Sequence, residues 1–297
     1  MCIRDSGDGA LGSRGAALKN PYCDDPHNYG FLRTDIKDLK YYANEIAGMG
    51  FQMNTHAIGD STVSVLLKEY QKVLDNIKDP RWRIEHSQVV DLKEFDLYND
   101  KILPSVQPTH ATSDMYWAYD RLGKRIEGAY AFKDLLSSSK KIALGTDFPV
   151  EKVNPFHTFY SSIERKDLNG YPENGFQIEN ALTREETLKG MTIWGAYFNF
   201  EENEKGSLEI GKSADFIIKS PGISTDSDVV KKLIHEGKEI ISEIEFAARY
   251  TSATLIGITG TNGKTTTTML TYKILKDSGL NVGIAGNIGD SLSLIHI

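Results

Sequence analysis

Two histidines and one aspartate stand at the ends of short apolar runs, and their side chains are suited to holding a metal ion. They are His56, His86 and Asp147. Neutral imidazoles and carboxylates are ligands of zinc and similar divalent ions. A bound metal lowers the pKa of its water from about 16 to about 7, and a carboxylate such as Asp147 can then move the proton. The ordinary interpretation stays open: such histidines are often hydrogen-bonded structural groups, and an Asp before Phe-Pro is often a turn residue.

Strand-like runs alternate with amphipathic stretches through this part of the chain. Alternation of this kind predicts a parallel sheet with helical crossovers. His56 and His86 are 30 positions apart, and Asp147 follows 61 positions later, about two further units. This period fits a (β/α)8 barrel, whose reactive groups lie at the carboxyl ends of the strands. The predicted strands are 51–56, 83–86, 102–107 and 142–147, and the predicted helices include 61–74 and 125–136.

Several motifs resemble the amidohydrolase superfamily, in particular the branch that includes N-substituted formamide deformylases. They are THAIGD at 55–60, RIEHSQ at 83–88, QPTHATSD at 107–114, GTDFPVE at 145–151, DGALGSRGAAL at 8–18 and KGSLEIGKSADFII at 205–218. The resemblance covers nearly all of 7–218 in order. It implies the back half of a (β/α)8 barrel, about strands 5–8, with a remnant of a small β domain.

The resemblance also implies roles for individual residues. His56 and His86 would be metal ligands after the fifth and sixth strands, with zinc as the expected metal. Asp147, after the eighth strand, would be the catalytic proton shuttle and an additional candidate ligand. The substrate-side candidates for a small amide-type substrate are Gln107, His110 and Arg165.

The match to the amidohydrolase pattern has gaps in the sequence. The family's first-strand His-x-His pair has no counterpart here, and the lysine that often precedes the Asp-Gly segment would fall within residues 1–6. A metal would keep two or three protein ligands. We therefore expect weak or absent metal binding and no turnover by the chain as it stands.

A second chemical motif lies near the other end of the chain. GITGTNGKTTT occupies 257–267, between a predicted strand at 254–260 and a predicted helix at 267–277 that ends at Gly279. Glycines let backbone N–H groups turn toward phosphate, and the helix N-terminus adds partial positive charge. Strict P-loop spacing would place the first glycine at position 258, which is Ile258. The neighbouring predictions are a helix, a turn at Gly237 and a short strand within 229–241, and a strand at 281–285.

This motif resembles the Mur ligases of peptidoglycan synthesis. SPGI at 220–223, EIE at 243–245 and GNIG at 286–289 narrow the resemblance to the UDP-N-acetylmuramoyl-L-alanine:D-glutamate ligase branch, over about 215–291. It implies ATP, Mg²⁺ and a UDP-sugar-linked substrate, which Asn287 would contact. It also implies a partial P-loop α/β domain, the start of the ligase central domain. The implied nucleotide-binding residues are Gly260, Thr261, Asn262, Gly263, Lys264, Thr265 and Thr266.

The two ends of the chain resemble one short DNA element translated from opposite strands. The head, 1–6, back-translates to a string whose reverse complement can encode the tail, 292–297, and the element is similar to a sequencing adapter. We therefore expect four parts: adapter-like ends at 1–6 and 292–297, an amidohydrolase part at 7–218 and a ligase part at 219–291. Both ends are excluded from the fold expectations.

Three interpretations of the whole chain follow. The first is a chimeric or truncated protein, derived from a C–N hydrolase and an ATP-dependent amino-acid ligase, and inactive as it stands. The second is a natural bifunctional hydrolase and ligase, which needs two whole active sites. The third is a non-catalytic nucleotide-binding module, which measurable ATP affinity dependent on Lys264 would distinguish.

Composition fits a globular enzyme-like chain. Of its 297 residues, 40% are hydrophobic and 25% charged, and the net charge is −7. This mildly acidic balance argues against a nucleic-acid or membrane-surface partner. Outside the head, Cys23 is the only cysteine, so no disulfide framework is expected. The expected location is the bacterial cytoplasm.

Overall fold

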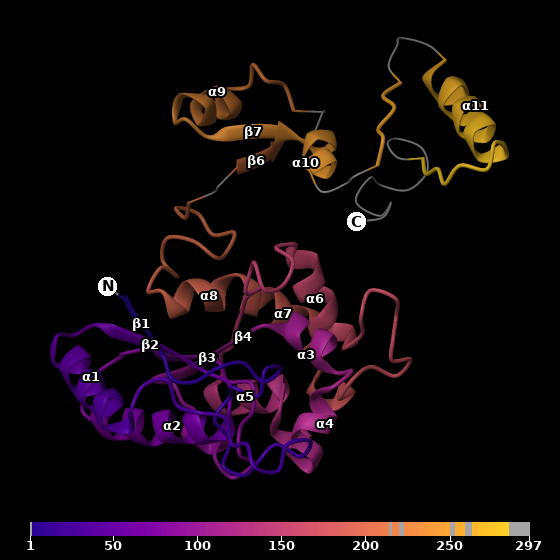
Figure 1. Ribbon diagram of the computed structural model, residues 1–297. Coiled ribbons are helices and arrows are strands. Elements are labelled where there is room, and N and C mark those ends of the chain that lie inside the picture. Colours follow the sequence, from indigo (N-terminus) through magenta and orange to yellow (C-terminus); the bar gives the residue numbers. More distant parts are fainter. Residues whose placement is uncertain (1, 214–215, 220–222, 250–252, 259–262, 285–297) are drawn as a thin grey trace. The chain divides into compact units, whose positions relative to one another are not determined.

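The computed structural model divides the chain into two units, Met1–Lys212 and Ser213–Ile297 (Figure 1). It describes residues 2–213, 216–219, 223–249, 253–258 and 263–284. Each unit is a body of its own and is described by itself.

The helices and strands of the first unit come in this order: β1 (Cys2–Ser6), α1 (Ile36–Gly48), β2 (Gln52–Ala57), α2 (Asp60–Leu74), β3 (Trp82–His86), η1 (Phe95–Leu97), β4 (Ile102–Val106), α3 (Pro108–Asp114), α4 (Ala118–Leu122), η2 (Gly123–Gly128), α5 (Phe132–Ser139), β5 (Ala143–Leu144), α6 (Pro155–Glu164), η3 (Ile178–Asn180), α7 (Arg184–Met191) and α8 (Ile193–Phe198). Those of the second unit are β6 (Phe216–Lys219), α9 (Asp228–His235), β7 (Glu239–Ser242), α10 (Glu243–Arg249) and α11 (Lys264–Asp277).

A parallel sheet organises the first unit. Its strands lie in chain order, β1-β2-β3-β4-β5, and each pairs in parallel with the strand before it. The four strands predicted from the sequence are confirmed as β2 to β5, and the predicted helix 61–74 is confirmed as α2. Because all strands run the same way, their carboxyl ends meet at one edge, and residues that follow different strands are brought together there.

Strand β2 is buried on both faces, as expected of a parallel sheet that helices cover, whereas Arg83 and Glu85 on one face of β3 are only half-buried. In β2, both Met53 and Thr55 on one face and Asn54 on the other are buried. The helix α2 joins β2 to β3 and packs Tyr70 edge-on against Trp82, with ring centroids 4.8 Å apart. Burial of such large side chains on both sides of the sheet fixes the register of its strands.

The head of the chain, which we had excluded from the fold expectations, takes part in this sheet. Cys2–Ser6 forms β1, which pairs with Gln52–His56 of β2. The pairing continues beyond the strand, where Gly7 N donates to His56 O at 2.9 Å. Strand pairing joins main-chain N–H and C=O groups, which every residue except proline carries in full, so it does not depend on the origin of the sequence.

The prediction of one helix over 125–136 is wrong. The structure has a 3-10 helix, η2, that ends at Gly128, and a separate helix, α5, that begins at Phe132. Between them the backbone pairs with another segment: Val90 N donates to Gly128 O and Tyr130 N donates to Gln88 O, at 2.9 and 2.8 Å. These long-range bonds replace the helical ones. Tyr130 has a φ of +53°, which a continuing helix cannot contain.

In the second unit, β6 and β7 form a two-stranded parallel sheet, and α9 and α10 contact β7. The prediction for 229–241 is confirmed: a helix (α9) is followed by Gly237 at φ +72° and by a strand (β7). The predicted helix 267–277 is confirmed as α11, which begins three residues earlier, and Gly279 follows it at φ +83°. Among the described residues, no helix has the length and apolar character needed to cross a bilayer.

Two strand predictions in this unit are wrong for the residues that the structure describes. Residues 254–258 of the predicted strand 254–260 and residues 281–284 of the predicted strand 281–285 are not in strands, and the rest of each range lies outside the described residues. A β-strand needs a second strand beside it to pair its backbone groups. Apolar, β-branched sequence alone does not supply one, and the only described sheet of this unit is β6 with β7.

We predict that Gly128→Ala destabilises the first unit. A Cβ at this position would lie 2.1 Å from Val90 O, so the backbone pairing around Gly128 must shift. We expect a loss of about 1–3 kcal/mol in the free energy of unfolding. The chain has three tryptophans, Trp82, Trp117 and Trp194, all in the first unit, so urea unfolding followed by tryptophan fluorescence reports on this unit.

The matched control is Gly48→Ala. Gly48 ends α1, and an added Cβ meets nothing within 4 Å. This variant should be as stable as the original chain or more stable by up to about 1 kcal/mol, because alanine favours helix. Equal urea midpoints for Gly128→Ala and the original chain would contradict the prediction.

Candidate metal centre

The carboxyl edge of the sheet collects the residues that the sequence singled out in the first unit. His56 lies near the end of β2, His86 ends β3, Gln107 follows β4, and Asp147 lies three residues after β5. The imidazole rings of His56 and His86 meet edge to face, with centroids 4.5 Å apart. Strands that neighbour one another in the sheet therefore bring these side chains into contact.

The ligand atoms of three side chains lie close enough together to share a metal ion. The ligand atoms of His86, His110 and Asp147 all lie within 4.8 Å of one another. His110 belongs to α3, which begins directly after β4, and its Nε2 lies 3.2 Å from Asp147 Oδ2. Among the described residues, this is the set of histidines, cysteines and acids that could hold an ion. His56 contacts this set through His86.

Two further carboxylates lie behind the histidines, and sequence reasoning assigned neither of them. Glu151 Oε1 is 3.4 Å from His110 Nδ1, and Asp8 Oδ1 is 3.4 Å from His56 Nδ1. Glu151 lies four residues after Asp147 in the same motif, and this short spacing is the signal that could have identified it. Asp8 gives no comparable signal, because 48 positions separate it from His56.

Asp8 fixes the loop that follows β2. Its buried carboxylate accepts hydrogen bonds from the backbone N–H groups of Ala17, Ile58 and Gly59, and from the Thr62 hydroxyl, at 2.8–3.1 Å. A carboxylate with this many donors is held in one orientation. It ties the start of the chain to the segment that carries His56.

Backbone conformation at the strand ends is unusual. His86 and Ser87 have φ values of +70° and +44°, and Asp147 has +56°. Hydrogen bonds hold the first pair: Ser87 Oγ donates to Ile84 O at 3.0 Å and accepts from Tyr98 OH at 2.8 Å. Residues in the left-handed region cost free energy and are frequent at functional sites, where they aim a side chain.

Burial and neighbouring carboxylates shift the pKa values of His86 and His110 in opposite directions. Burial, with the nearby His56, lowers the pKa of His86 to about 4, so its ring is neutral at pH 7 and its nitrogens can act as ligands. Burial alone would lower the pKa of His110, but hydrogen bonds to Glu151 and Asp147 and the charge of Asp114 outweigh it and raise that pKa. The hydrogen bond from His110 lowers the pKa of Glu151.

The residues present fit a divalent cation. The Nδ1 atom of His86 is buried and has no hydrogen-bond partner, whereas Nδ1 of His56 faces Asp8 at 3.4 Å. Buried polar atoms nearly always have a partner, so the unpartnered nitrogen of His86 calls for an explanation. Imidazole nitrogen with carboxylate oxygen is a donor set that suits zinc and related ions.

The remaining predicted substrate-side residues lie apart from each other. The Gln107 amide is a hydrogen-bonding neighbour of His86. Arg165 is fully buried between the rings of Phe132 and Phe176, and donates to the backbone oxygens of Phe176 and Tyr130 at 2.9 and 3.2 Å. This burial lowers its pKa to about 10. In this structure Arg165 joins loops to each other.

The predicted nucleotide-binding residues lie around the start of α11. Gly263, with φ +76°, precedes this helix, and Lys264, Thr265 and Thr266 form its exposed first turn. Gly260, Thr261, Asn262 and Asn287 lie outside the described residues.

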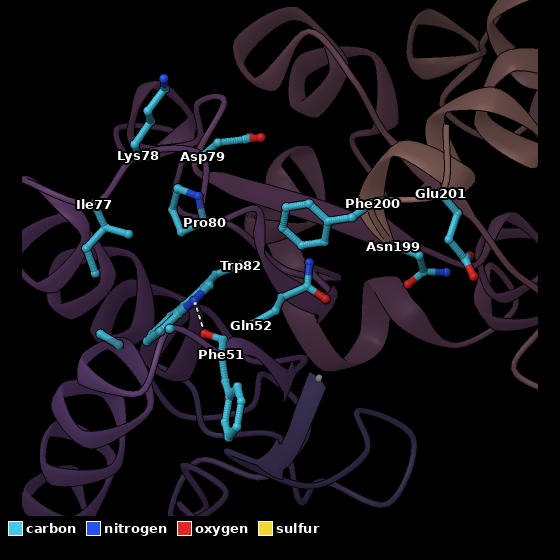
Figure 2. A pocket seen from close by; sticks show the side chains of 12 residues that line it. Phe51, Gln52, Ile77, Lys78, Asp79, Pro80, Trp82, Asn199, Phe200 and Glu201 are labelled. Carbon is cyan, nitrogen blue, oxygen red and sulfur yellow. Dashed lines mark hydrogen bonds between the residues drawn. The ribbon is translucent and has the colours of Figure 1, made fainter. Parts of the chain in front are cut away.

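A pocket of about 680 Å³ opens at the opposite, amino edge of the sheet (Figure 2). Its wall includes Phe51 and Trp82 at the starts of β2 and β3, and Phe200 after α8. Its polar groups are used within the protein: Trp82 Nε1 donates to Phe51 O at 3.0 Å, and Gln52 Nε2 donates to the backbone oxygens of Arg81 and Phe198. The converging ligand atoms lie at the other edge, and we therefore place the candidate site there.

Comparison with known families finds the two families that the motifs resemble, over different residues. Residues 3–241 match the amidohydrolase family, and residues 258–296 match the Mur ligase middle domain. The first match extends beyond residue 218, where we expected the amidohydrolase part to end.

Individual relatives agree with this division. The chain is 32% identical over 218 residues to Protein LONG AFTER FAR-RED 3 of Arabidopsis thaliana, which covers 72% of this chain and 37% of that protein. It is 62% identical over 82 residues to UDP-N-acetylmuramoylalanine--D-glutamate ligase of Bacteroides fragilis, which covers 28% of this chain and 18% of the ligase. An uncharacterized metal-dependent hydrolase from Pyrococcus horikoshii has a similar structure, with a TM-score of 0.62 and 28% identity over 71% of this chain and 42% of that one.

The chain thus spans well under half the length of each relative that it matches. The two matches fall on different residues and on unrelated families, so the chain is chimeric in arrangement. Since the first match covers most of its length, and the parallel α/β fold agrees with it, the chain belongs to the amidohydrolase family and carries in addition a segment similar to the Mur ligase middle domain.

Proposed function

We propose that the first unit carries part of the active site of a metal-dependent hydrolase that cleaves the C–N bond of a small amide-type molecule. The observation that carries this proposal is the convergence of His86, His110 and Asp147 at the carboxyl edge of a parallel sheet. In this proposal β2 to β5 correspond to strands 5–8 of a (β/α)8 barrel, and β1 takes the place of the strand before them. The match to the amidohydrolase family supports it.

In the proposed site, His56 and His86 bind a divalent metal, most simply zinc. When bound, the metal supplies an activated water and polarises the scissile carbonyl. Asp147 then moves a proton between the water and the leaving nitrogen, since its carboxylate lies at the site and contacts His110. The Gln107 amide orients His86. Neutral His86 is ready to bind without first losing a proton.

We propose that these 297 residues, alone, bind metal weakly and do not turn over substrate. The described residues supply two or three ligands, and catalytic zinc sites use three protein ligands with an open position for water. Positioning by a complete set of groups contributes most of the rate of such reactions.

We propose that the second unit derives from the ATP-binding part of a Mur ligase that adds D-glutamate. The 62% identity to the Bacteroides ligase supports this. In that proposal residues 260–266 contact ATP phosphates, with Lys264 on the outer phosphates and Thr265 on Mg²⁺, and Asn287 contacts a UDP-sugar-linked substrate. Gly263 before the exposed first turn of α11 is the geometry that a phosphate-binding loop uses. Ligase activity of this chain is not expected, because phosphoryl transfer depends on several positioned charges.

Zinc titration by isothermal calorimetry tests the metal site. We expect one zinc per chain with a dissociation constant on the order of 1 µM or weaker, because few ligands are in place. His86→Ala should abolish this binding. The control is His27→Ala, an exposed histidine of the first unit, which should bind zinc as the original chain does. Unchanged affinity in His86→Ala would contradict the proposed site.

Turnover is tested separately, on N-acyl and N-formyl amines with saturating zinc, by detecting the released amine. We expect no release above the buffer control, since the positioning groups are incomplete. A turnover rate of about 1 s⁻¹ would be typical of an enzyme and would contradict the proposal that this chain does not turn over substrate.

ATP affinity tests the second unit. We expect a fluorescent ATP analogue with Mg²⁺ to bind with a dissociation constant of about 1 mM or weaker. This corresponds to a binding free energy of about 4 kcal/mol or less in magnitude. Lys264→Ala and the control Lys273→Ala, on the same helix, should then behave alike. Tighter binding that is lost in Lys264→Ala and kept in Lys273→Ala would instead support a nucleotide-binding module.

A further inference from the structure

His110 is held between two carboxylates. Its side chain is 11% exposed, and each of its ring nitrogens faces a carboxylate: Nε2 faces Asp147 and Nδ1 faces Glu151. Nε2 thus lies on the side of the cluster in which the ligand atoms of His86, His110 and Asp147 converge.

The spacing of His110 and Asp147 fits a shared cation. In a tetrahedral zinc site with bonds of about 2.1 Å, neighbouring ligand atoms lie about 3.4 Å apart. His110 Nε2 and Asp147 Oδ2 are 3.2 Å apart, close to that edge length. The ligand atoms of His86, His110 and Asp147 all lie within 4.8 Å of one another, so each pair needs a movement of at most about 1.4 Å to reach that edge length.

We propose that His110 is a third histidine ligand, in addition to His56 and His86 and next to Asp147, and that Glu151 is the positioning residue that orients it. This proposal rests on the proposed metal-dependent function and adds a ligand and a positioning residue to it. Metal-bound histidines almost always donate their second ring N–H to a carboxylate, carbonyl or water, which fixes the tautomer and the ring plane. Glu151 is in place to accept that proton from Nδ1, so Nε2 is left to bind the metal.

Glu151 is itself held in place. Ser113, on the same helix as His110, donates from Oγ to Glu151 Oε1 at 2.6 Å. His110 and Ser113 lie three residues apart on α3, so this helix supplies both the proposed ligand and the hydroxyl that holds Glu151. The loop after Asp147 carries Glu151 and is thereby tied to α3, the helix after β4. His110 and Asp147 thus belong to one connected group of side chains.

The test measures zinc affinity and the response of the His110 ring in the 297-residue chain. We expect Glu151→Gln to weaken zinc binding by about 10- to 100-fold, as loss of an outer carboxylate does. His110→Gln should weaken it at least as much. In ¹⁵N spectra of imidazole nitrogens, His110 Nε2 should shift on addition of zinc up to the millimolar range, while His27 should not.

Controls separate a ligand from a structural group. Glu45→Gln, an exposed acid on α1, should bind zinc as the original chain does. Urea unfolding in the presence of a chelator shows whether each variant is folded without metal. With cobalt(II) in place of zinc, His110→Gln should change the visible spectrum, because a ligand is lost. Glu151→Gln should give the original spectrum at higher cobalt concentration, because only orientation is lost.

The outcomes distinguish this proposal from the one on which it rests. If zinc binds and His86→Ala abolishes it, but His110→Gln and Glu151→Gln bind as tightly as the original chain, the further proposal is overturned and the metal site stands. If His86→Ala leaves binding unchanged, the metal site itself fails. A His110 resonance that does not respond to millimolar zinc overturns the role of His110, whatever the affinity.

Discussion

The parallel direction of neighbouring strands is the constraint on which the structure of the first unit depends. Because β2, β3, β4 and β5 all point the same way, the segments that follow them must leave from one edge. His56, His86 and Asp147 are far apart in sequence, yet they reach the same small region through this arrangement alone. The position of the site is thus a consequence of strand direction, and burial then keeps the imidazole of His86 neutral at pH 7.

The sequence predicted the positions of the strands because short strand-like runs alternate with amphipathic stretches, and four such runs contain β2 to β5, although β5 is only Ala143–Leu144. It failed where long-range pairing competes with local preference. Residues 125–136 have helical spacing, but the hydrogen bonds of Gly128 and Tyr130 to the segment 88–90 break the helix. Residues 254–258 have strand composition but no neighbouring strand among the described residues.

The candidate site was predictable only in part. Histidines and acids at strand ends could be found from their positions, because those positions carry functional groups in barrel-like folds. Asp8 and Glu151 could not be assigned, since their relation to His56 and His110 exists only after folding. Arg165 was expected near substrate, but the structure buries it between two aromatic rings, an environment that spacing in the sequence does not reveal.

The position of the first strand has a consequence for the outer edge of its sheet. β1 is an outermost strand of its sheet, and one row of its main-chain groups is used by β2. On its other side, β1 pairs with no described strand. An outer strand is the place where another extended segment can add to a sheet, because main-chain pairing does not depend on side-chain identity.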